Sequence, residues 1–365
     1  MHFRRRQQVA TAGFAVAALA LAACSSSSSS STSSAAGSTS SASASSNSSL
    51  SGTLNGSGST FQTVFQESAI SAFKSVDPGI TVNYGSGGSG KGRTDLASGV
   101  VNYAGSDSPI PSSETASFKG KTVLYFPVII GPIALAYNLS GVTNLKLDPA
   151  TIAGIFQGTI TKWNASQIAA DNPGVSLPST TITAAVRSDS SGTTQNFTLF
   201  LKDAEPSVWT LGSSSTIKWP TSARAGNGNP GVAQIVKSTP GAIGYVDYAD
   251  AKASGLSMAE VKNSSGAYVA PSAASASAAA DGATIASNLT FAAAWASGAS
   301  SYPVTYQSWV LVYAAQPTAN DAALLKSYIG YLLGAGQQLL PNLGYAPLPS
   351  SLDQKAVAQL SQITS

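Results

Sequence analysis

The chain has 365 residues, of which only 10% are charged, with 19 basic and 16 acidic residues and a formal net charge of +3. So small a charge does not support a nucleic-acid partner, which usually needs a basic surface. The single histidine, His2, and the single cysteine, Cys24, both stand near the N-terminus. The rest of the chain therefore lacks the residues for Ser–His–Asp or Cys–His catalysis, for histidine-ligated zinc and for disulfides.

The N-terminus has the pattern of an export signal. Three consecutive arginines from Arg4 precede an apolar run over residues 9–23, which is short for a membrane-spanning helix of about 20 residues. The run ends in LAAC at residues 21–24, which resembles the lipobox of bacterial lipoproteins. We expect a signal peptide over residues 1–23 and a lipid on the Cys24 sulfur. An ordinary secretory signal with a chance cysteine is the alternative.

Residues 24–51 form a predicted tether. They are almost entirely Ser, Thr, Ala, Gly and Asn, and such a segment cannot bury enough apolar surface to fold. The expected location is the extracytoplasmic face of the cell membrane, where the lipid on Cys24 would anchor the protein. The many Ser and Thr residues leave O-glycosylation of the tether open.

About 310 residues follow the tether, and this length predicts two domains. Apolar residues at helical spacing predict a first helix whose buried face comprises Phe61, Val64, Phe65, Ala69, Ala72, Phe73 and Val76. Strands are expected at residues 81–84, 122–130, 133–137, 181–186 and 306–313, and terminal helices at 322–333 and 352–363. This alternation predicts an α/β fold. The Ala/Ser-rich residues 270–301 are expected to form an irregular surface excursion or a helix with few anchors.

Three loops rich in glycine and hydroxyl groups share one physical character. They read GSGSTF at residues 56–61, GGSGKG at 87–92 and RSDSSGT at 187–193, and each leads into a predicted helix start. Free N–H groups at a helix start bind anions, glycines admit a ligand close to the backbone, and Ser and Thr hydroxyls add donors. Together the loops predict a small oxyanion held where several helix N-termini meet.

Six motifs, in order along the chain, resemble those of the phosphate-binding lipoproteins of the phosphate-specific ABC transporter, the PstS family. The three loops resemble the family's GxGxTF segment, its second glycine loop and its RxDxSGT motif. AGSDSP at 104–109 resembles its GASDxP segment, and IFQGTITKW at 155–163 and PGAIGYV at 240–246 resemble landmarks outside the site. The similarity covers nearly all of residues 52–350.

The resemblance implies an α/β fold with two lobes of the periplasmic-binding-protein type II, joined by hinge crossings near Ile130 and Tyr306. Lobe I would comprise residues 52–130 and 306–365, and lobe II residues 131–305. The resemblance also implies a monomeric binding protein with no enzymatic activity, cofactor or metal. Such a protein captures inorganic phosphate and delivers it to the permease subunits of an ABC importer.

The resemblance also assigns phosphate contacts to residues in these loops. Asp189 would hold the guanidinium of Arg187 in place. Each position also has a purely structural interpretation, as a helix cap, a core residue or a turn. The predicted phosphate contacts are Thr60, Phe61, Ser89, Asp107, Arg187, Ser191, Gly192 and Thr193.

Asp107 is unexpected in an anion site, because like charges repel. Phosphate at neutral pH still carries a proton, however, which an ionised carboxylate accepts in a short hydrogen bond. Sulfate offers no proton, and sites built on a required hydrogen bond discriminate by about 10⁴–10⁵.

Two positions depart from the family pattern. Ser190 precedes Ser191 where the family often has glycine, and Lys91 either adds charge near the site or points to solvent.

Several alternatives compete with phosphate delivery. A binding protein for sulfate or molybdate, and a phosphate sensor, would use the same loops. The GxGxxG pattern at residues 85–90 matches a dinucleotide-binding fingerprint by its letters, although an exported lipoprotein has little access to NAD. Ser71 and Lys74 match the SxxK motif of penicillin-recognising serine hydrolases, but they fall inside the first predicted helix and no KTG follows.

Overall fold

A computed structural model describes residues 50–365. The predicted signal peptide, the lipid on Cys24 and nearly all of the predicted tether lie outside the described residues. Among residues 50–365, no helix is both long and apolar enough to cross a membrane.

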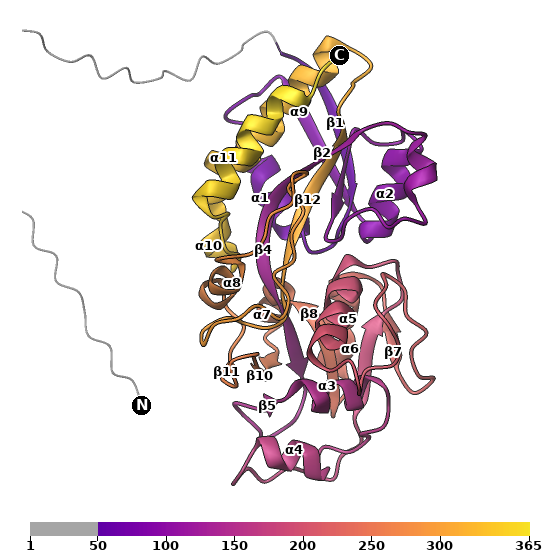
Figure 1. Ribbon diagram of the computed structural model, residues 1–365, viewed down its shortest axis with the longest axis vertical. Coiled ribbons are helices and arrows are strands. Elements are labelled where there is room, and N and C mark those ends of the chain that lie inside the picture. Colours follow the sequence, from indigo (N-terminus) through magenta and orange to yellow (C-terminus); the bar gives the residue numbers. More distant parts are fainter. Residues whose placement is uncertain (1–49) are drawn as a thin grey trace, which may run out of the picture. The chain divides into compact units, whose positions relative to one another are not determined.

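The described residues build one nine-stranded sheet in the order β2-β1-β3-β12-β4-β8-β6-β7, with β9 paired to β4, and a small sheet in the order β11-β10-β5. Strands β1, β2 and β3 run parallel at one end of the large sheet, and β6, β7 and β8 run parallel at the other. The antiparallel strands β4 and β12 join these two half-sheets (Figure 1). The strands are β1 (Gly52–Gly58), β2 (Ile80–Ser86), β3 (Tyr103–Ser106), β4 (Val123–Tyr137), β5 (Lys146–Leu147), β6 (Thr183–Arg187), β7 (Arg224–Gly226), β8 (Ala242–Asp247), β9 (Ser257–Met258), β10 (Glu260–Lys262), β11 (Tyr268–Val269) and β12 (Thr305–Tyr313).

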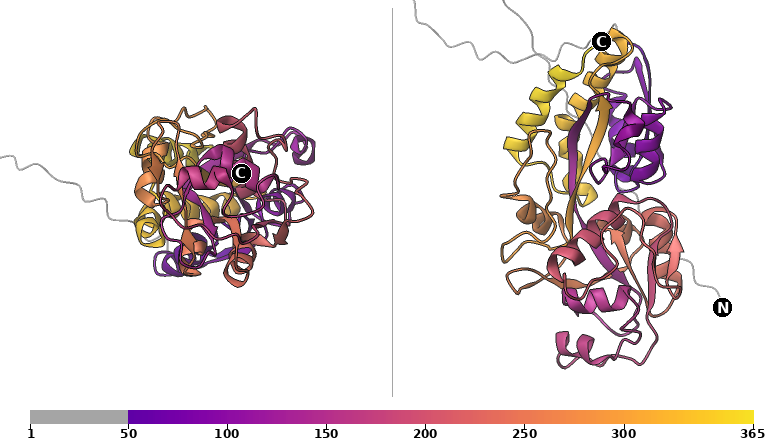
Figure 2. Two further views of the ribbon diagram at one scale, coloured as in Figure 1. Left: turned by 90° about the horizontal axis from the view of Figure 1, so that it is seen from below. Right: turned by 45° about the vertical axis from the view of Figure 1, so that its right-hand side comes forward.

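Helices connect the strands and cover the sheet. The α-helices are α1 (Thr63–Phe73), α2 (Ser89–Ala97), α3 (Pro149–Phe156), α4 (Ser166–Asp171), α5 (Gly192–Ala204), α6 (Gly228–Ser238), α7 (Tyr248–Ala253), α8 (Ala273–Ala280), α9 (Ala319–Leu333), α10 (Leu340–Leu343) and α11 (Ser350–Gln359). Short 3₁₀ helices are η1 (Thr115–Phe118), η2 (Ala335–Leu339) and η3 (Leu360–Gln362). In Figure 2, α9 and α11 lie beside β4 and β12 near the C-terminus, and α5 and α6 lie at the other half-sheet.

Strand β4 differs from the sequence prediction, which expected separate strands at 122–130 and 133–137. It is one strand of 15 residues, and nearly all of its residues are buried. Proline is normally tolerated in a sheet only at an edge or a bulge. Here the register with β12 shifts between Ser308 and Trp309, opposite Pro127, so a bulge accommodates this proline within a central strand.

The two expected hinge crossings lie side by side. Ile130 on β4 pairs with Gln307 on β12, and Tyr306 pairs with Gly131. Both strands therefore pass from one half-sheet to the other at the same level. The division into lobes at these positions stays a prediction.

Two local predictions need correction. On α1, Phe65, Ala69 and Phe73 are buried as the helical spacing predicts, but Val76 lies beyond the helix and is 54% exposed. The 270–301 segment contains a helix, as one of the two expected alternatives has it, but this helix is anchored in the core. Its helix α8 buries small alanine side chains against β4, and its following loop buries Phe291, because alanines allow close packing that a composition-based prediction does not detect.

The sheet geometry places several strand ends together. Ser106, the last residue of β3, pairs with Trp309, and Asp247, the last residue of β8, pairs with Ile133. The parallel strands of both half-sheets thus point their carboxyl ends toward the same middle stretch of β4. Ligands of open α/β sheets bind outside the carboxyl ends of strands, so this meeting point is the natural place for a site.

Candidate functional site

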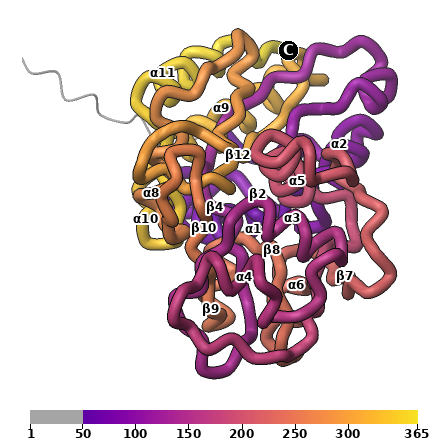
Figure 3. Tube along the Cα trace, turned by 60° about the horizontal axis from the view of Figure 1, so that its bottom comes forward, coloured from indigo at the N-terminus to yellow at the C-terminus, as the bar shows by residue number. Residues whose placement is uncertain are grey.

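The candidate site lies where the loops that follow β1, β2, β3, β6 and β7 meet. The Gly90 N–H donates to the Ser190 carbonyl across 3.0 Å. A methyl group added to Gly192 would stand 2.4 Å from the Ser89 hydroxyl oxygen. Helices α2 and α5, which begin at these loops, lie next to each other in two views (Figure 1, Figure 3). The loops that the sequence predicted to share a site are therefore in contact.

Local chemistry explains why these loops turn into helices. Ser191 caps α5, since its side-chain oxygen accepts the Thr194 N–H at 3.1 Å. Gly88, just before α2, has a φ of +90°, and a Cβ there would lie 2.3 Å from Asp189 Oδ2, so only glycine fits. N–H groups in the first turn of a helix have no intrahelical partner. Those of Gly90 and Thr194 are taken by Ser190 and Ser191, which leaves the other first-turn N–H groups of α2 and α5 to attract an anion.

Asp107 is buried at the centre of the site, with 1% of its surface exposed. Its Oδ1 accepts hydrogen bonds from the hydroxyls of Ser59 at 2.5 Å and Ser308 at 2.6 Å, and its Oδ2 accepts a longer one from Ser89 at 3.2 Å. Burial raises the pKa of Asp107, although these hydroxyls and the charge of Arg187 partly offset the increase. Oδ2 is the carboxylate oxygen better placed to accept another hydrogen bond.

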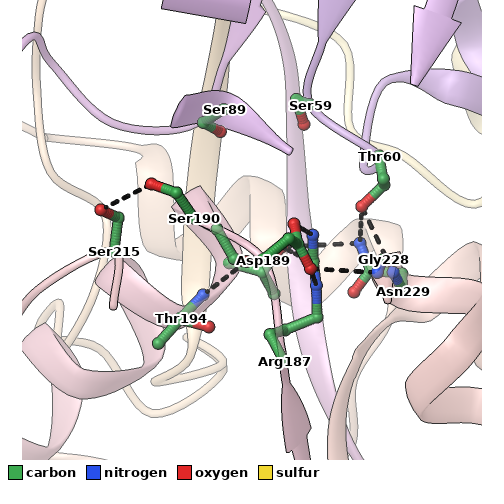
Figure 4. Close-up of polar contacts among 12 residues, drawn as sticks. Ser59, Thr60, Ser89, Arg187, Asp189, Ser190, Thr194, Ser215, Gly228 and Asn229 are labelled. Atoms are coloured by element: carbon green, nitrogen blue, oxygen red, sulfur yellow. Dashed lines mark hydrogen bonds and ion pairs between the residues drawn. The ribbon is translucent and has the colours of Figure 1, made fainter. Parts of the chain in front are cut away.

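Arg187 is held in one orientation by Asp189. Its Nε donates to Asp189 Oδ1 at 2.8 Å and its Nη2 donates to Oδ2 at 2.5 Å (Figure 4). Its Nη1 donates to Thr193 Oγ1 at 3.2 Å. Burial would raise the pKa of Asp189, but its bonds to Arg187 and the arginine charge lower that pKa below the ordinary value. Because Asp189 offsets the arginine charge, hydrogen-bond donors and helix starts must supply much of the attraction for an anion.

All eight predicted contact residues are buried and belong to the loops that meet here. Phe61 is buried, as its place on the predicted apolar face implies. Its N–H donates to Ser59 Oγ at 3.1 Å, and its ring packs against those of Tyr306 and Tyr345, with centroids 4.2 and 5.0 Å away. Lys91 pairs with Asp95, and its side chain is 54% exposed, so its charge is directed to solvent.

The sequence prediction missed several polar residues of the site. Ser59 stands in the first glycine loop, so its hydroxyl could have been suspected from the motif. The others come from segments distant in the sequence, on β12, α6, the end of β8 and the loop after α10, and no local pattern marks them. They are Ser308, Asn229, Asp247 and Tyr345.

Comparisons with known proteins agree with this arrangement. Residues 28–335 match the family described as PBP superfamily domain. "Phosphate-binding protein PstS 3" of Mycobacterium leprae is 35% identical over 315 residues, covering 83% of this chain and 85% of the relative. "Phosphate-binding protein PstS 2" of Mycobacterium tuberculosis is 33% identical over 329 residues, covering 85% and 87%. The chain belongs to the PBP superfamily and, within it, to the PstS family.

Solved structures confirm the fold of this PstS-family chain. A high-affinity periplasmic phosphate-binding protein, PfluDING, bound with phosphate, aligns with a TM-score of 0.70 at 21% identity, covering 84% of this chain and 94% of that chain. A phosphate-binding protein from Stenotrophomonas maltophilia aligns with a TM-score of 0.70 at 18% identity, covering 84% and 93%. The predicted α/β, periplasmic-binding-protein-like fold is therefore confirmed.

A buried carboxyl group, Asp247, lies behind the first loop of the site. The Tyr345 hydroxyl lies 2.7 Å from Asp247 Oδ2 and 3.0 Å from the Phe61 carbonyl oxygen. One hydroxyl hydrogen cannot serve both oxygens. A proton on Asp247 would satisfy both contacts, with the carboxyl donating to Tyr345 and Tyr345 donating to Phe61. Consistently, burial, followed by the charge of Asp250, raises the pKa of Asp247 well above its ordinary value of 3.8.

This arrangement predicts a pH dependence of stability. Because the folded-state pKa of Asp247 is raised, its contribution to stability is fully present below its unfolded pKa and is lost as the pH rises through its folded pKa. The asparagine in Asp247→Asn still offers an N–H donor to the Tyr345 hydroxyl, but it does not change its charge with pH. We therefore expect the difference in melting temperature between the variant and wild type to increase with pH. The increase should be about 2–4 °C for each kcal/mol of stability that wild type loses.

Thermal melts from mildly acidic to alkaline pH, in the absence of added anions, would measure this difference. Asp203→Asn, at an exposed position on α5, is the matched control. A constant offset between Asp247→Asn and wild type at every pH would contradict the prediction.

Proposed function

We propose that this chain is an extracytoplasmic solute-binding lipoprotein that captures inorganic phosphate and delivers it to the permease subunits of an ABC importer. In this proposal the lipid on Cys24 anchors a monomeric binding domain to the membrane, and no cofactor, metal or covalent step takes part. The relatives that this chain resembles are named phosphate-binding proteins, which supports phosphate as the ligand.

One observation carries the proposal: a buried carboxylate stands among hydrogen-bond donors. The hydroxyls of Ser59 and Ser308 occupy Oδ1 of Asp107, while Oδ2 has a single long contact with Ser89. An anion held at this point by helix starts and by Arg187 would face Oδ2. Phosphate can donate its proton to that oxygen, whereas a fully deprotonated oxyanion would face a like charge and an unpaired acceptor.

The mechanism follows from the burial of the site. Thr60, Ser89, Arg187 and Thr193 are each at most 6% exposed, so an ion reaches them only when the loops of the two half-sheets separate. We propose that lobe I (52–130 and 306–365) and lobe II (131–305) open and close about the paired crossings of β4 and β12. Phosphate drives closure only through its better contacts in the closed state.

The alternative functions gain less support. Ser71 and Lys74, the residues of the serine-hydrolase pattern, are both exposed on or next to α1 and lie outside the cluster around Asp107. A sulfate or molybdate carrier would have to overcome the charge of Asp107. A phosphate sensor would use the same site, and only the downstream partner would differ.

Calorimetric titration of the purified protein, stripped of bound anions, tests the proposal at neutral pH with phosphate, sulfate and molybdate. We expect tight one-to-one binding of phosphate and no measurable response to sulfate. Binding of sulfate or molybdate with no response to phosphate would overturn the choice of ligand. Phosphate uptake would then be compared between cells that contain the protein and cells that lack it. Reduced uptake without the protein indicates delivery, and unchanged uptake indicates sensing.

Gly192→Ala offers a test of the close packing at the site. A Cβ at Gly192 would lie 2.6 Å from Asp107 Cβ as well as 2.4 Å from the Ser89 oxygen, closer than real Cβ atoms approach. We expect the variant to close poorly and to bind phosphate about 10–100-fold more weakly, since displacements of about 1 Å at such sites have effects of that order.

The matched control is Gly85→Ala on β2, where the nearest atom to an added Cβ is 3.9 Å away. Titration of both variants with phosphate would compare them. Equal affinities for Gly192→Ala and Gly85→Ala would contradict the close packing of α5 against Ser89 and Asp107.

A further inference from the structure

Asn229, near the start of α6, connects parts of the site that come from both half-sheets. It is fully buried. Its backbone N–H and its Nδ2 both donate to Thr60 Oγ1, at 3.3 and 3.1 Å (Figure 4). Its Nδ2 also lies 3.5 Å from Thr193 Oγ1. Thr60 follows β1, whereas Thr193 is on α5, so a single side chain bridges the two predicted threonine contacts.

The orientation of the Asn229 amide follows from its other contact. The backbone N–H of Asp247 donates to Asn229 Oδ1 at 3.1 Å. The oxygen of the amide must therefore face Asp247, because an NH₂ group there would meet another donor. The NH₂ group then necessarily faces the two threonine hydroxyls.

A count of lone pairs gives the consequence. A hydroxyl has one hydrogen to donate and two lone pairs that accept. Asn229 fills both lone pairs of Thr60 Oγ1, and Thr193 Oγ1 accepts from Arg187 at 3.2 Å and from Asn229. Both hydroxyl hydrogens are thus left to donate to a further acceptor, as an anion requires.

We infer that Asn229 is a positioning residue for phosphate, which orients the hydroxyls of Thr60 and Thr193 as donors and thereby favours an oxyanion that accepts from both. This inference rests on the proposed function. Asn229 acts through the two threonines and through its bridge between the half-sheets, without a contact of its own to the ion.

A double-mutant cycle measured by phosphate titration separates this role from a merely structural one. Asn229→Ala removes hydrogen bonds whose loss should weaken phosphate binding by about 10–100-fold. In the Thr60→Val, Thr193→Val double variant, no threonine hydroxyl remains to be oriented. Adding Asn229→Ala to this background should therefore reduce phosphate affinity by less than about threefold. An equal loss in both backgrounds, or no loss in the wild-type background, would overturn the inference.

Two further variants keep the test decisive. Asn227→Ala, two residues earlier, alters an exposed asparagine whose side chain makes no capping bond, and it should bind phosphate like wild type. Asn229→Asp preserves shape and the contact with Asp247, but its carboxylate would accept from Thr60 and reverse that hydroxyl. We expect it to fold and to lose more affinity than Asn229→Ala; wild-type affinity in a folded Asn229→Asp protein would refute the inference.

Failure of the inference and failure of the proposed function give different results. If wild type does not bind phosphate in the calorimeter, the proposed function fails. If wild type binds phosphate tightly and the Asn229 variants bind as tightly, only the role of Asn229 is wrong.

Discussion

Arg187→Ala should abolish tight phosphate binding. The guanidinium is nearly fully buried at the end of β6, and Asp189 and Thr193 fix its orientation, so an anion would meet a preorganised cationic donor. Hydrogen bonds to charged groups contribute about 1.5–3 kcal/mol each, so the loss of two predicts a drop of about 10²–10⁴-fold in affinity.

The variant has one complication, because it leaves the buried carboxylate of Asp189 without its partner. Unpaired buried charges destabilise proteins strongly, so part of the effect could arise from unfolding. The double variant Arg187→Ala, Asp189→Ala removes both charges and should fold while still failing to bind. Arg224→Ala, at an exposed arginine on β7, is the control. Near-wild-type affinity in the folded double variant would mean that the site lies elsewhere.

Asp107→Asn should reduce the discrimination between phosphate and sulfate more than it reduces phosphate affinity. The amide oxygen can still accept from Ser59 and Ser308, but its NH₂ group replaces the acceptor Oδ2 and removes a negative charge. Loss of one charged hydrogen bond predicts about a tenfold weaker binding of phosphate. Sulfate should gain affinity at the same time, so that the affinity ratio falls by about 10²-fold or more.

Parallel titrations of Asp107→Asn with phosphate and sulfate measure both affinities, with Asp281→Asn, an exposed position, as the control. Equal losses for the two anions would disprove the proton-readout argument. The pH dependence offers a second check. Since burial raises the pKa of Asp107, protonation should begin above its ordinary pKa, and wild-type discrimination against sulfate should weaken as the pH falls through the raised value.

Local patterns in the sequence predicted much of the fold. Helix spacing and helix caps depend only on residues that are close together in the sequence, so they can be recognised without the structure. The spacing of Phe65, Ala69 and Phe73 marks α1, and Ser191 next to Gly192 marks the start of α5. The prediction failed where packing decides the outcome. The sequence predicted separate strands at 122–130 and 133–137, but Gly131 and Pro132 pair with Tyr306 and Thr305 of β12, which keeps β4 one strand.

The sequence by itself determined the chemical character of the site: glycine loops at helix starts, one arginine, and a carboxylate in the AGSDSP segment. Only the tertiary structure decided how these groups are oriented. Ser308 and Asn229 lie 201 and 169 residues from Asp107 and Thr60, their hydrogen-bond partners. Contacts across such separations depend on the order of strands in the sheet, which brings the carboxyl ends of two half-sheets together, and no local propensity encodes that meeting.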